Sequence, residues 1–221
     1  MKKIPLLYGS DPGLLLGFHG CDKSVAEGVI AGRIMLHPSV NKYDWLGPGI
    51  YFWQNNYERA MEFAWEQARR GKVSEPAVIG AVISLDNCLD LLDKQCIDVL
   101  KDFALNSIYE VKTIFDFVLK KQHPIPETGK NNTLLRVLDN YYIESLHDER
   151  EMKRKPPFDT VRCAFIEGAP IYPGAGFYEK SHIQICIRNP NCIKGFFNPR
   201  EEMEWPVANK AHSEEMPSIL S

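Results

Sequence analysis

Hydrophobic and polar positions divide the chain into two β-rich parts separated by a helical stretch. Residues 14–19, LLLGFH, form a short apolar run that predicts a strand. After Ser24, which can cap a helix, Val25, Val29 and Ile30 recur at helical spacing and predict a short helix. Further elements follow: a loop at 33–42, the segment YDWLGPGIYFW (43–53) that turns into a buried strand, a helix over 56–71 closed by Gly71, and a buried strand at 77–85.

The pattern changes at residue 86. Two segments, 89–121 and 133–152, have helical periodicity and no strand signal, and a loop joins them at 122–132. Strand patterning then returns at 159–168, 181–189 and 192–198, with a Pro/Gly-rich loop at 169–180. We therefore expect one α+β domain over 1–221, with a helical insertion at about 86–153 and a flexible tail at 206–221.

Composition narrows the function classes only slightly. The 221 residues suit a single domain, and no apolar run approaches the roughly 20 residues that span a membrane. The N-terminal apolar run is short and is interrupted by Pro5, which is not typical of a signal peptide. A net charge of −3 argues against a broad phosphate-binding surface. The six cysteines show no C-x-x-C spacing, so we expect buried free thiols in the cytoplasm and no metal site.

Four features occur in a characteristic order. They are Phe18-His19-Gly20 at a strand end, Gly49-Ile50-Tyr51-Phe52 after a glycine loop, a helix directly after it, and a late strand from Ser181. This order resembles the poly(ADP-ribose) polymerase-like, or diphtheria-toxin-like, ADP-ribosyltransferases. The resemblance covers roughly residues 14–92 and 158–198 and leaves the helical insertion unmatched. It implies an ADP-ribosyltransferase-like split sheet and NAD+ as the substrate, without a metal.

The resemblance also implies roles for single residues. The backbone of Gly20 would pair with the nicotinamide carboxamide, since glycine permits close approach of a ligand. Tyr51 would stack on the nicotinamide ring, which contributes on the order of 1 kcal/mol beyond the buried area. His19 would hydrogen-bond a ribose hydroxyl and hold the sugar in its reactive geometry. His19 has a plainer alternative as a structural histidine, and Tyr51 has one as part of a core strand.

The chain departs from the family pattern in the helix after Tyr51. The second stacking aromatic of the family falls near Glu62, which cannot stack, so Phe63 or Trp65 is the substitute, with Phe63 as simple core the alternative. The small hydroxyl residue that holds the carboxamide in the family falls near Arg59.

A second departure concerns the late-strand glutamate. If Ile193 and Phe197 match the apolar positions of the final strand, the glutamate position falls on Gln184. Gln184 keeps hydrogen-bonding ability but not charge, which favours transfer of a single ADP-ribose over chain building. The candidate carboxylate is Glu179, and His182, two residues before Gln184 on the same strand face, is a candidate base or acceptor contact. The alternative is that Gln184 is only a polar strand residue.

The loop before GIYF is the last part of the predicted NAD+ site. Asn41, Tyr43, Asp44 and Trp45 lie where the family covers the adenosine side of NAD+, and Trp45 is equally a core anchor. A small basic cluster and three tyrosines could hold a single-stranded nucleic acid, or the cluster is a solvated helix end; its residues are Arg150, Lys153, Arg154, Lys155 and Arg162, with Tyr141, Tyr142 and Tyr172.

These features together predict a mono-ADP-ribosyltransferase that modifies nucleic acid (RNA or DNA) or protein. Family analogy suggests a bacterial toxin or phage-defence effector with a neutralising antitoxin partner, in the cytoplasm and away from membranes. Two alternatives stay open: a non-catalytic module that binds NAD+ or ADP-ribose, and an NAD+ glycohydrolase with water as the acceptor.

Overall fold

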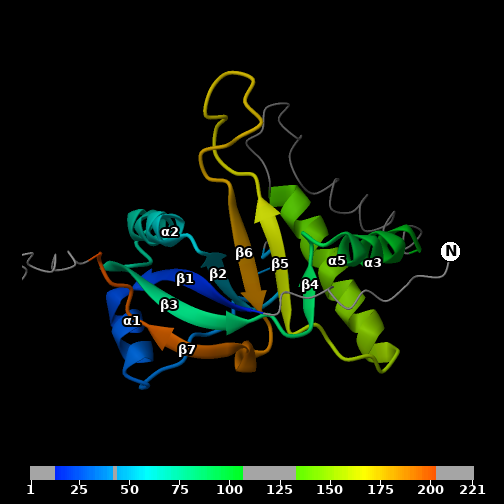
Figure 1. Cartoon of the computed structure of the whole chain (residues 1–221), viewed down its shortest axis with the longest axis horizontal. Helices are drawn as coiled ribbons and strands as arrows, with labels where there is room; N and C mark the ends of the chain where they lie inside the picture. Colours follow the sequence, from blue (N-terminus) through cyan, green and yellow to red (C-terminus); the bar gives the residue numbers. More distant parts are fainter. Residues whose placement is uncertain (1–12, 42–43, 107–132, 203–221) are drawn as a thin grey trace, which may run out of the picture.

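A seven-stranded sheet forms the centre of the computed structural model, which describes residues 13–41, 44–106 and 133–202 (Figure 1). The strand order is β4-β5-β6-β2-β1-β3-β7, and all neighbours run antiparallel except β4 and β5. The strands are β1 Leu14–Asp22, β2 Ile50–Gln54, β3 Pro76–Ser84, β4 Cys88–Asp90, β5 Thr160–Phe165, β6 His182–Ile187 and β7 Ile193–Phe197. This mixed sheet with flanking helices confirms the α+β class.

Helices α1 (Lys23–Ile30) and α2 (Tyr57–Arg69) cover opposite faces of the sheet. Ile79 packs in the same buried cluster as α1, whereas its neighbour Val78 packs with Ala60 of α2. Because successive strand residues point to opposite faces, the two helices lie on different sides of β3. The predicted cap of α1, Ser24, is wrong, because the observed cap lies two residues earlier.

The cap of α1 is Asp22, whose carboxylate accepts a hydrogen bond from the backbone N–H of Ser24 at 3.0 Å. Asp22 also accepts from the backbone of Ser74 and Glu75, so one carboxylate ties the helix start to the approach of β3. The end of α2 follows the prediction, since Gly71 adopts a positive φ of 71° directly after the helix.

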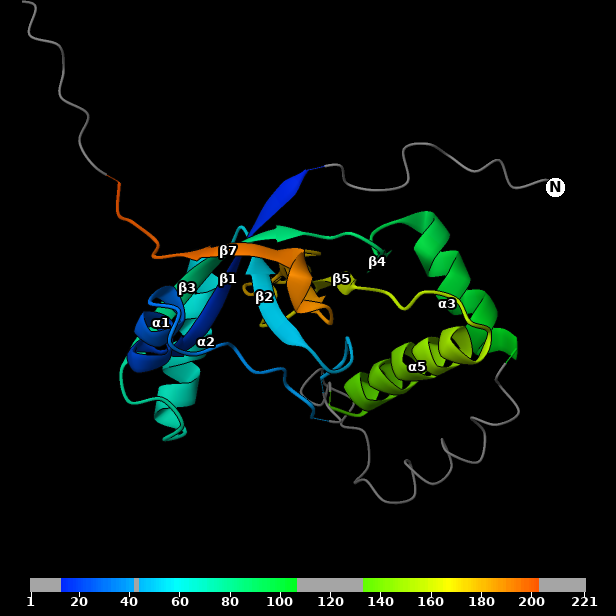
Figure 2. The ribbon, with the colours of Figure 1, turned by 90° about the horizontal axis from the view of Figure 1, so that it is seen from below.

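Helices α3 (Lys94–Asn106) and α5 (Thr133–Met152) pack together beside the β4–β5 edge, as Figure 2 shows. Ile143 and Leu146 of α5 share a buried cluster with Leu89 of β4 and Val161 of β5. The helical prediction for this region therefore holds for α3 and α5. The part of the first predicted helix at 107–121 lies outside the described residues, as do 122–132, 206–221 and Tyr43.

One strand lies inside the range expected to be helical. Strand β4 pairs in parallel with β5, and Asp90 at its end forms an ion pair with Arg162 at 2.9 Å. Arg162 also donates to Gln54 at 2.8 Å, so this arginine is held within the sheet and does not join the basic cluster. A three-residue strand has too little sequence for a period-2 pattern, and its pairing with a distant strand decides its structure.

The late strands take different places in the sheet. Strands β5 and β6 form an antiparallel pair, with Phe165 opposite His182 and Cys163 opposite Gln184. Strand β7 instead pairs with β3 at the other edge. Strand β6 also pairs with β2, so the two motifs GIYF and HIQICI lie side by side.

Candidate functional site

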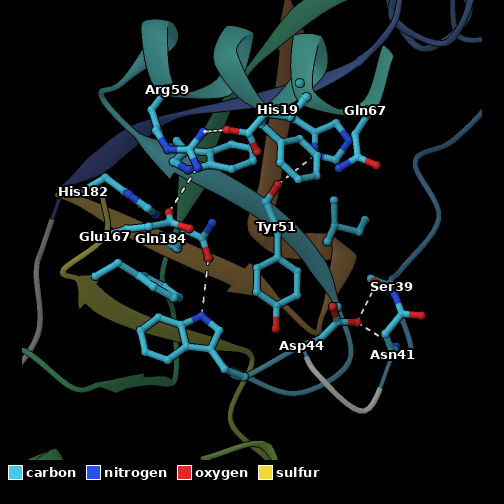
Figure 3. A pocket seen from close by; sticks show the side chains of 18 of the residues that line it. His19, Ser39, Asn41, Asp44, Tyr51, Arg59, Gln67, Glu167, His182 and Gln184 are labelled. Atoms are coloured by element: carbon cyan, nitrogen blue, oxygen red, sulfur yellow. Dashed lines mark hydrogen bonds and ion pairs between the residues drawn. The ribbon is translucent and has the colours of Figure 1, made fainter. Parts of the chain in front are cut away.

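A cavity of about 500 Å³ opens where strands β1 and β2 separate. The β1–β2 ladder pairs Gly17 with Gln54 and Phe18 with Trp53, while β1 stays paired with β3 as far as Asp22. Among the described strands no β1–β2 pair follows Phe18. The wall includes residues from β1, the loop before β2, α2 and the β5–β6 hairpin: His19, Gly20, Ser39, Asn41, Asp44, Trp45, Tyr51, Arg59, Phe63, Glu66, Gln67, Arg70, Lys72, Phe165, Glu167, His182 and Gln184 (Figure 3).

The side chain of His19 bridges the gap between the two strands. Its Nδ1 lies 2.8 Å from the carbonyl oxygen of Tyr51. A carbonyl only accepts, so Nδ1 carries the proton and donates it. Burial lowers the pKa of His19 below its ordinary value of 6.5, which favours the neutral ring. In that tautomer Nε2 is an acceptor, suited to a hydroxyl donor.

Tyr51 lies near the centre of the view in Figure 3, with its ring held from the loop side. Its hydroxyl donates to the carbonyl of Gly47 at 2.7 Å and accepts from the N–H of Leu46 at 3.1 Å. Burial raises the pKa of the Tyr51 phenol above its ordinary value of 10.0, so the group stays protonated. Gly47 has a φ of 84°, which favours glycine and sets the turn that brings its carbonyl to Tyr51.

Gly20 lines the cavity, but its lack of a side chain serves the fold. A Cβ built on Gly20 would lie 2.1 Å from the carbonyl oxygen of Ala60 and 3.2 Å from the nitrogen of Ala64. Helix α2 therefore packs so closely against β1 that no side chain fits at position 20. The contact with helix α2 therefore requires glycine at this position, independently of any ligand.

Gln184 and His182 both line the cavity from β6, as their shared strand face predicted. The side-chain oxygen of Gln184 accepts from the indole N–H of Trp45 at 3.4 Å. The ring of His182 stacks on Phe165 with centroids 5.0 Å apart, and its Nδ1 lies 2.6 Å from the carbonyl of Lys180. Trp45 lines the cavity and also packs against the buried cluster that contains Ile143 and Leu146 of α5.

Arg59 and Phe63 reach the cavity from α2. Arg59 is buried, and its Nη2 donates to the carboxylate of Glu167 at 3.1 Å. Phe63 packs on the ring of Trp53 at a centroid distance of 4.9 Å while lining the cavity. Trp65, the other aromatic considered, is 53% exposed and lies outside the cavity wall. Phe63 is thus the aromatic of this helix that the fold brings to the site.

The loop before β2 folds around one carboxylate. Asp44 accepts hydrogen bonds from the hydroxyl of Ser39 and from the backbone N–H of Asn41 at 2.7 Å. Asn41 and Asp44 both line the cavity, as predicted for the loop. Glu179, by contrast, is not part of the cavity wall; its carboxylate accepts from the N–H of Ala169 at 3.3 Å, within the β5–β6 hairpin.

Sequence reasoning missed four charged residues of the wall: Glu66, Arg70, Lys72 and Glu167. Glu66 and Arg70 follow Arg59 and Phe63 at helical spacing, so the helix periodicity could have indicated them, whereas Lys72 comes after the helix stop at Gly71. Glu167 follows β5 and carries no local signal. Its place depends on the pairing of β5 with β6.

The remaining candidates lie elsewhere. The basic residues near the end of α5 are part of that helix end: Lys153 pairs with Glu149 at 2.7 Å, and the guanidinium of Arg150 lies 4.0 Å from the ring centre of Phe158. All six cysteines are free thiols, three of them buried, and burial raises the pKa of Cys186 to about 12. Across the described ranges, no group of three or more His, Cys, Asp or Glu side chains is arranged to hold a metal ion.

No helix in the described part of the chain has both the length and the apolar character needed to cross a bilayer.

Comparison with known proteins adds little to this geometry. The chain is 25% identical to an uncharacterised protein of Methanocaldococcus jannaschii over a 212-residue alignment that covers 85% of each chain. No family model matches the chain, and no solved structure matches it significantly.

Proposed function

We propose that this chain is an NAD+-dependent mono-ADP-ribosyltransferase of the poly(ADP-ribose) polymerase-like type. One observation carries the proposal. His19, Gly20, Tyr51 and Gln184 come from three separate segments of the sequence, received roles from the resemblance, and line a single cavity. A concave site with a few convergent polar groups and flat aromatic walls suits a dinucleotide with one cationic ring.

Tyr51 is the proposed platform for nicotinamide. Both hydrogen bonds of its hydroxyl fix the ring before a ligand arrives, so stacking costs little side-chain entropy. The nicotinamide carboxamide pairs with the main chain of Gly20, on the part of β1 that extends beyond its ladder with β2. Phe63 supplies a second aromatic surface of the same cavity.

His19 is the proposed ligand of a ribose hydroxyl. With Nδ1 committed to the carbonyl of Tyr51, the neutral ring offers Nε2 as an acceptor. The pyrophosphate of NAD+ requires positive charge, and Arg70 and Lys72 supply it at the C-terminal end of α2. Asn41 and Asp44 present polar groups to the adenosine side.

In the proposed reaction the bond between C1′ of the ribose and the nicotinamide nitrogen breaks, and its electron pair leaves with nicotinamide. An acceptor nucleophile then bonds to C1′ and releases its proton to solvent. Positioning of the reactants in such a site supplies several kcal/mol of barrier reduction. The acceptor is a nucleic acid or a protein, in a cell where the enzyme acts as a toxin or defence effector kept in check by a partner protein.

Release of nicotinamide from NAD+ by the purified protein tests the proposal. Wild type is compared with His19→Ala, Tyr51→Ala and Gln184→Ala, with added RNA, DNA or total protein. Trp65→Ala is the matched aromatic control, since it changes an exposed residue of α2 outside the cavity. We expect release by wild type and by the control, and loss of at least tenfold in the His19 and Tyr51 variants.

The same assay separates the alternatives. Transfer of label from NAD+ to one macromolecular fraction identifies the acceptor. Nicotinamide release without a labelled macromolecule would identify an NAD+ glycohydrolase. Gln184, a neutral residue at the glutamate position, favours a binding module as the second candidate, and tight NAD+ binding without any release would establish it.

A further inference from the structure

Glu167 is a carboxylate of the cavity that no motif indicated. It follows β5, whose residues Cys163 and Phe165 lie opposite Gln184 and His182. The pairing continues past the strand, because the N–H of Lys180 donates to the carbonyl of Glu167 at 2.9 Å. Alternation along an extended chain then puts Glu167 on the same face as Phe165, and Glu167 joins Gln184 and His182 in the cavity wall (Figure 3).

Arg59 fixes the position of this carboxylate. The arginine is buried, with a side chain only 7% exposed, and its Nη2 donates to Glu167 at 3.1 Å. The Glu167 side chain is 29% exposed, so it remains open to the cavity while its partner is not. A buried, hydrogen-bonded anchor from α2 thus holds an accessible carboxylate from the β5–β6 hairpin.

The positive charge of Arg59 does not cancel Glu167. The Nη1 atom of Arg59 also lies 3.7 Å from the carboxylate of Glu62 and 3.8 Å from that of Glu66, and Glu66 pairs with Lys180 at 2.8 Å. Three carboxylates therefore face two cations, which leaves a formal net charge of −1. Glu66 and Glu167 are the two members that line the cavity.

We propose that Glu167 supplies, from the strand next to Gln184, the negative charge that stabilises the cationic ribose during nicotinamide release. This inference rests on the proposed function. Glu167 forms no bond: the C1′–nitrogen bond breaks, its electron pair leaves with neutral nicotinamide, and the positive charge that remains on the ribose faces the carboxylate. Gln184 then contributes hydrogen bonds and Glu167 contributes negative charge, so residues of two neighbouring strands together replace the single glutamate of the family.

Glu167→Gln is the direct test, since it keeps shape and hydrogen bonding but removes the charge. We expect the maximal rate of nicotinamide release to fall about 10- to 100-fold, the effect of unit charges roughly 6–12 Å apart at an effective dielectric constant of about 20. NAD+ affinity should fall by less than the rate does, because the positive charge moves from the nicotinamide ring onto the ribose only in the transition state. The melting temperature should stay within a few degrees of wild type, since the amide keeps the contact with Arg59.

Glu62→Gln is the matched control. It removes another carboxylate partner of the same arginine, but Glu62 is 55% exposed and lies outside the cavity wall. Its rate should fall much less than that of Glu167→Gln, because Glu62 shares Arg59 but does not line the cavity. A second variant distinguishes loss of charge from a purely structural effect. Gln184→Glu in the Glu167→Gln background returns a carboxylate to the cavity and should recover part of the rate.

The outcomes are distinct. An active wild type with an equally active Glu167→Gln variant overturns the role of Glu167 and leaves the proposed transferase intact. Equal rate losses in Glu167→Gln and Glu62→Gln, or a loss that follows NAD+ affinity, assign Glu167 a structural role and also overturn the inference. A wild type that releases no nicotinamide with any acceptor fraction overturns both proposals together.

Discussion

The hydroxyl and the ring of Tyr51 have separable roles, and Tyr51→Phe separates them. The substitution removes the hydrogen bonds to the Gly47 carbonyl and from the Leu46 N–H while keeping the ring. Each hydrogen bond contributes about 1 kcal/mol net, so we expect a loss of about 2 kcal/mol in the free energy of unfolding. For a chain of this size that loss lowers the melting temperature by roughly 4–8 °C.

Denaturant unfolding and NAD+ titration measure the two roles. Tyr51→Phe should bind NAD+ within a few-fold of wild type, because the stacking surface remains. Tyr51→Ala should lose at least about tenfold more affinity, since it loses both the stacking and the apolar contact. A Tyr51→Phe variant as stable as wild type would refute the assigned hydrogen bonds. Equal affinities of Tyr51→Phe and Tyr51→Ala would refute the platform.

Three further predictions concern other parts of the cavity. The stability advantage of wild type over His19→Gln should be complete above about pH 6.5 and shrink as the pH falls. The reason is that the pKa of His19 is lowered in the folded protein, so the unfolded chain binds the proton first. Denaturant titrations between about pH 5 and 8 measure the difference in unfolding free energy, and a difference that does not change with pH contradicts the prediction. Gly20→Ala should lower the free energy of unfolding by about 1–3 kcal/mol or more, because the added methyl group meets the Ala60 carbonyl. A variant as stable as wild type would contradict this contact. Replacing Arg70 and Lys72 by alanine should weaken NAD+ binding about tenfold at low salt and less at high salt, and a salt-independent change would argue against phosphate contacts.

Local sequence patterns predicted the helices and strands that are long enough to show hydrophobic periodicity. Helix α2 is predicted because its apolar face and the stop at Gly71 lie within one stretch of chain. Strand β4 has only three residues and forms because β5 lies beside it. Its structure comes from a contact across the fold, which periodicity does not record.

The same distinction applies to the site. His19 and Tyr51 were identified since each lies in a motif with a recognisable order, and the structure brings both to one cavity. Glu179 was chosen for being near Gln184 in sequence, yet its carboxylate turns to the N–H of Ala169. Glu167 is farther along the chain from Gln184 but reaches the cavity through the β5–β6 pairing.

The charges of the cavity fit the polarity of NAD+ in one direction. Glu167 meets Arg59 near the start of α2, while Arg70 and Lys72 lie at its end, and a helix of 13 residues is about 20 Å long. In the proposed complex the cationic nicotinamide riboside faces the acidic end and the pyrophosphate faces the basic end. Reversing the dinucleotide would bring like charges together at both ends, which is costly in a partly dry site. Orientation is then set by charges at the two ends, and a neutral Gln184 does not change it.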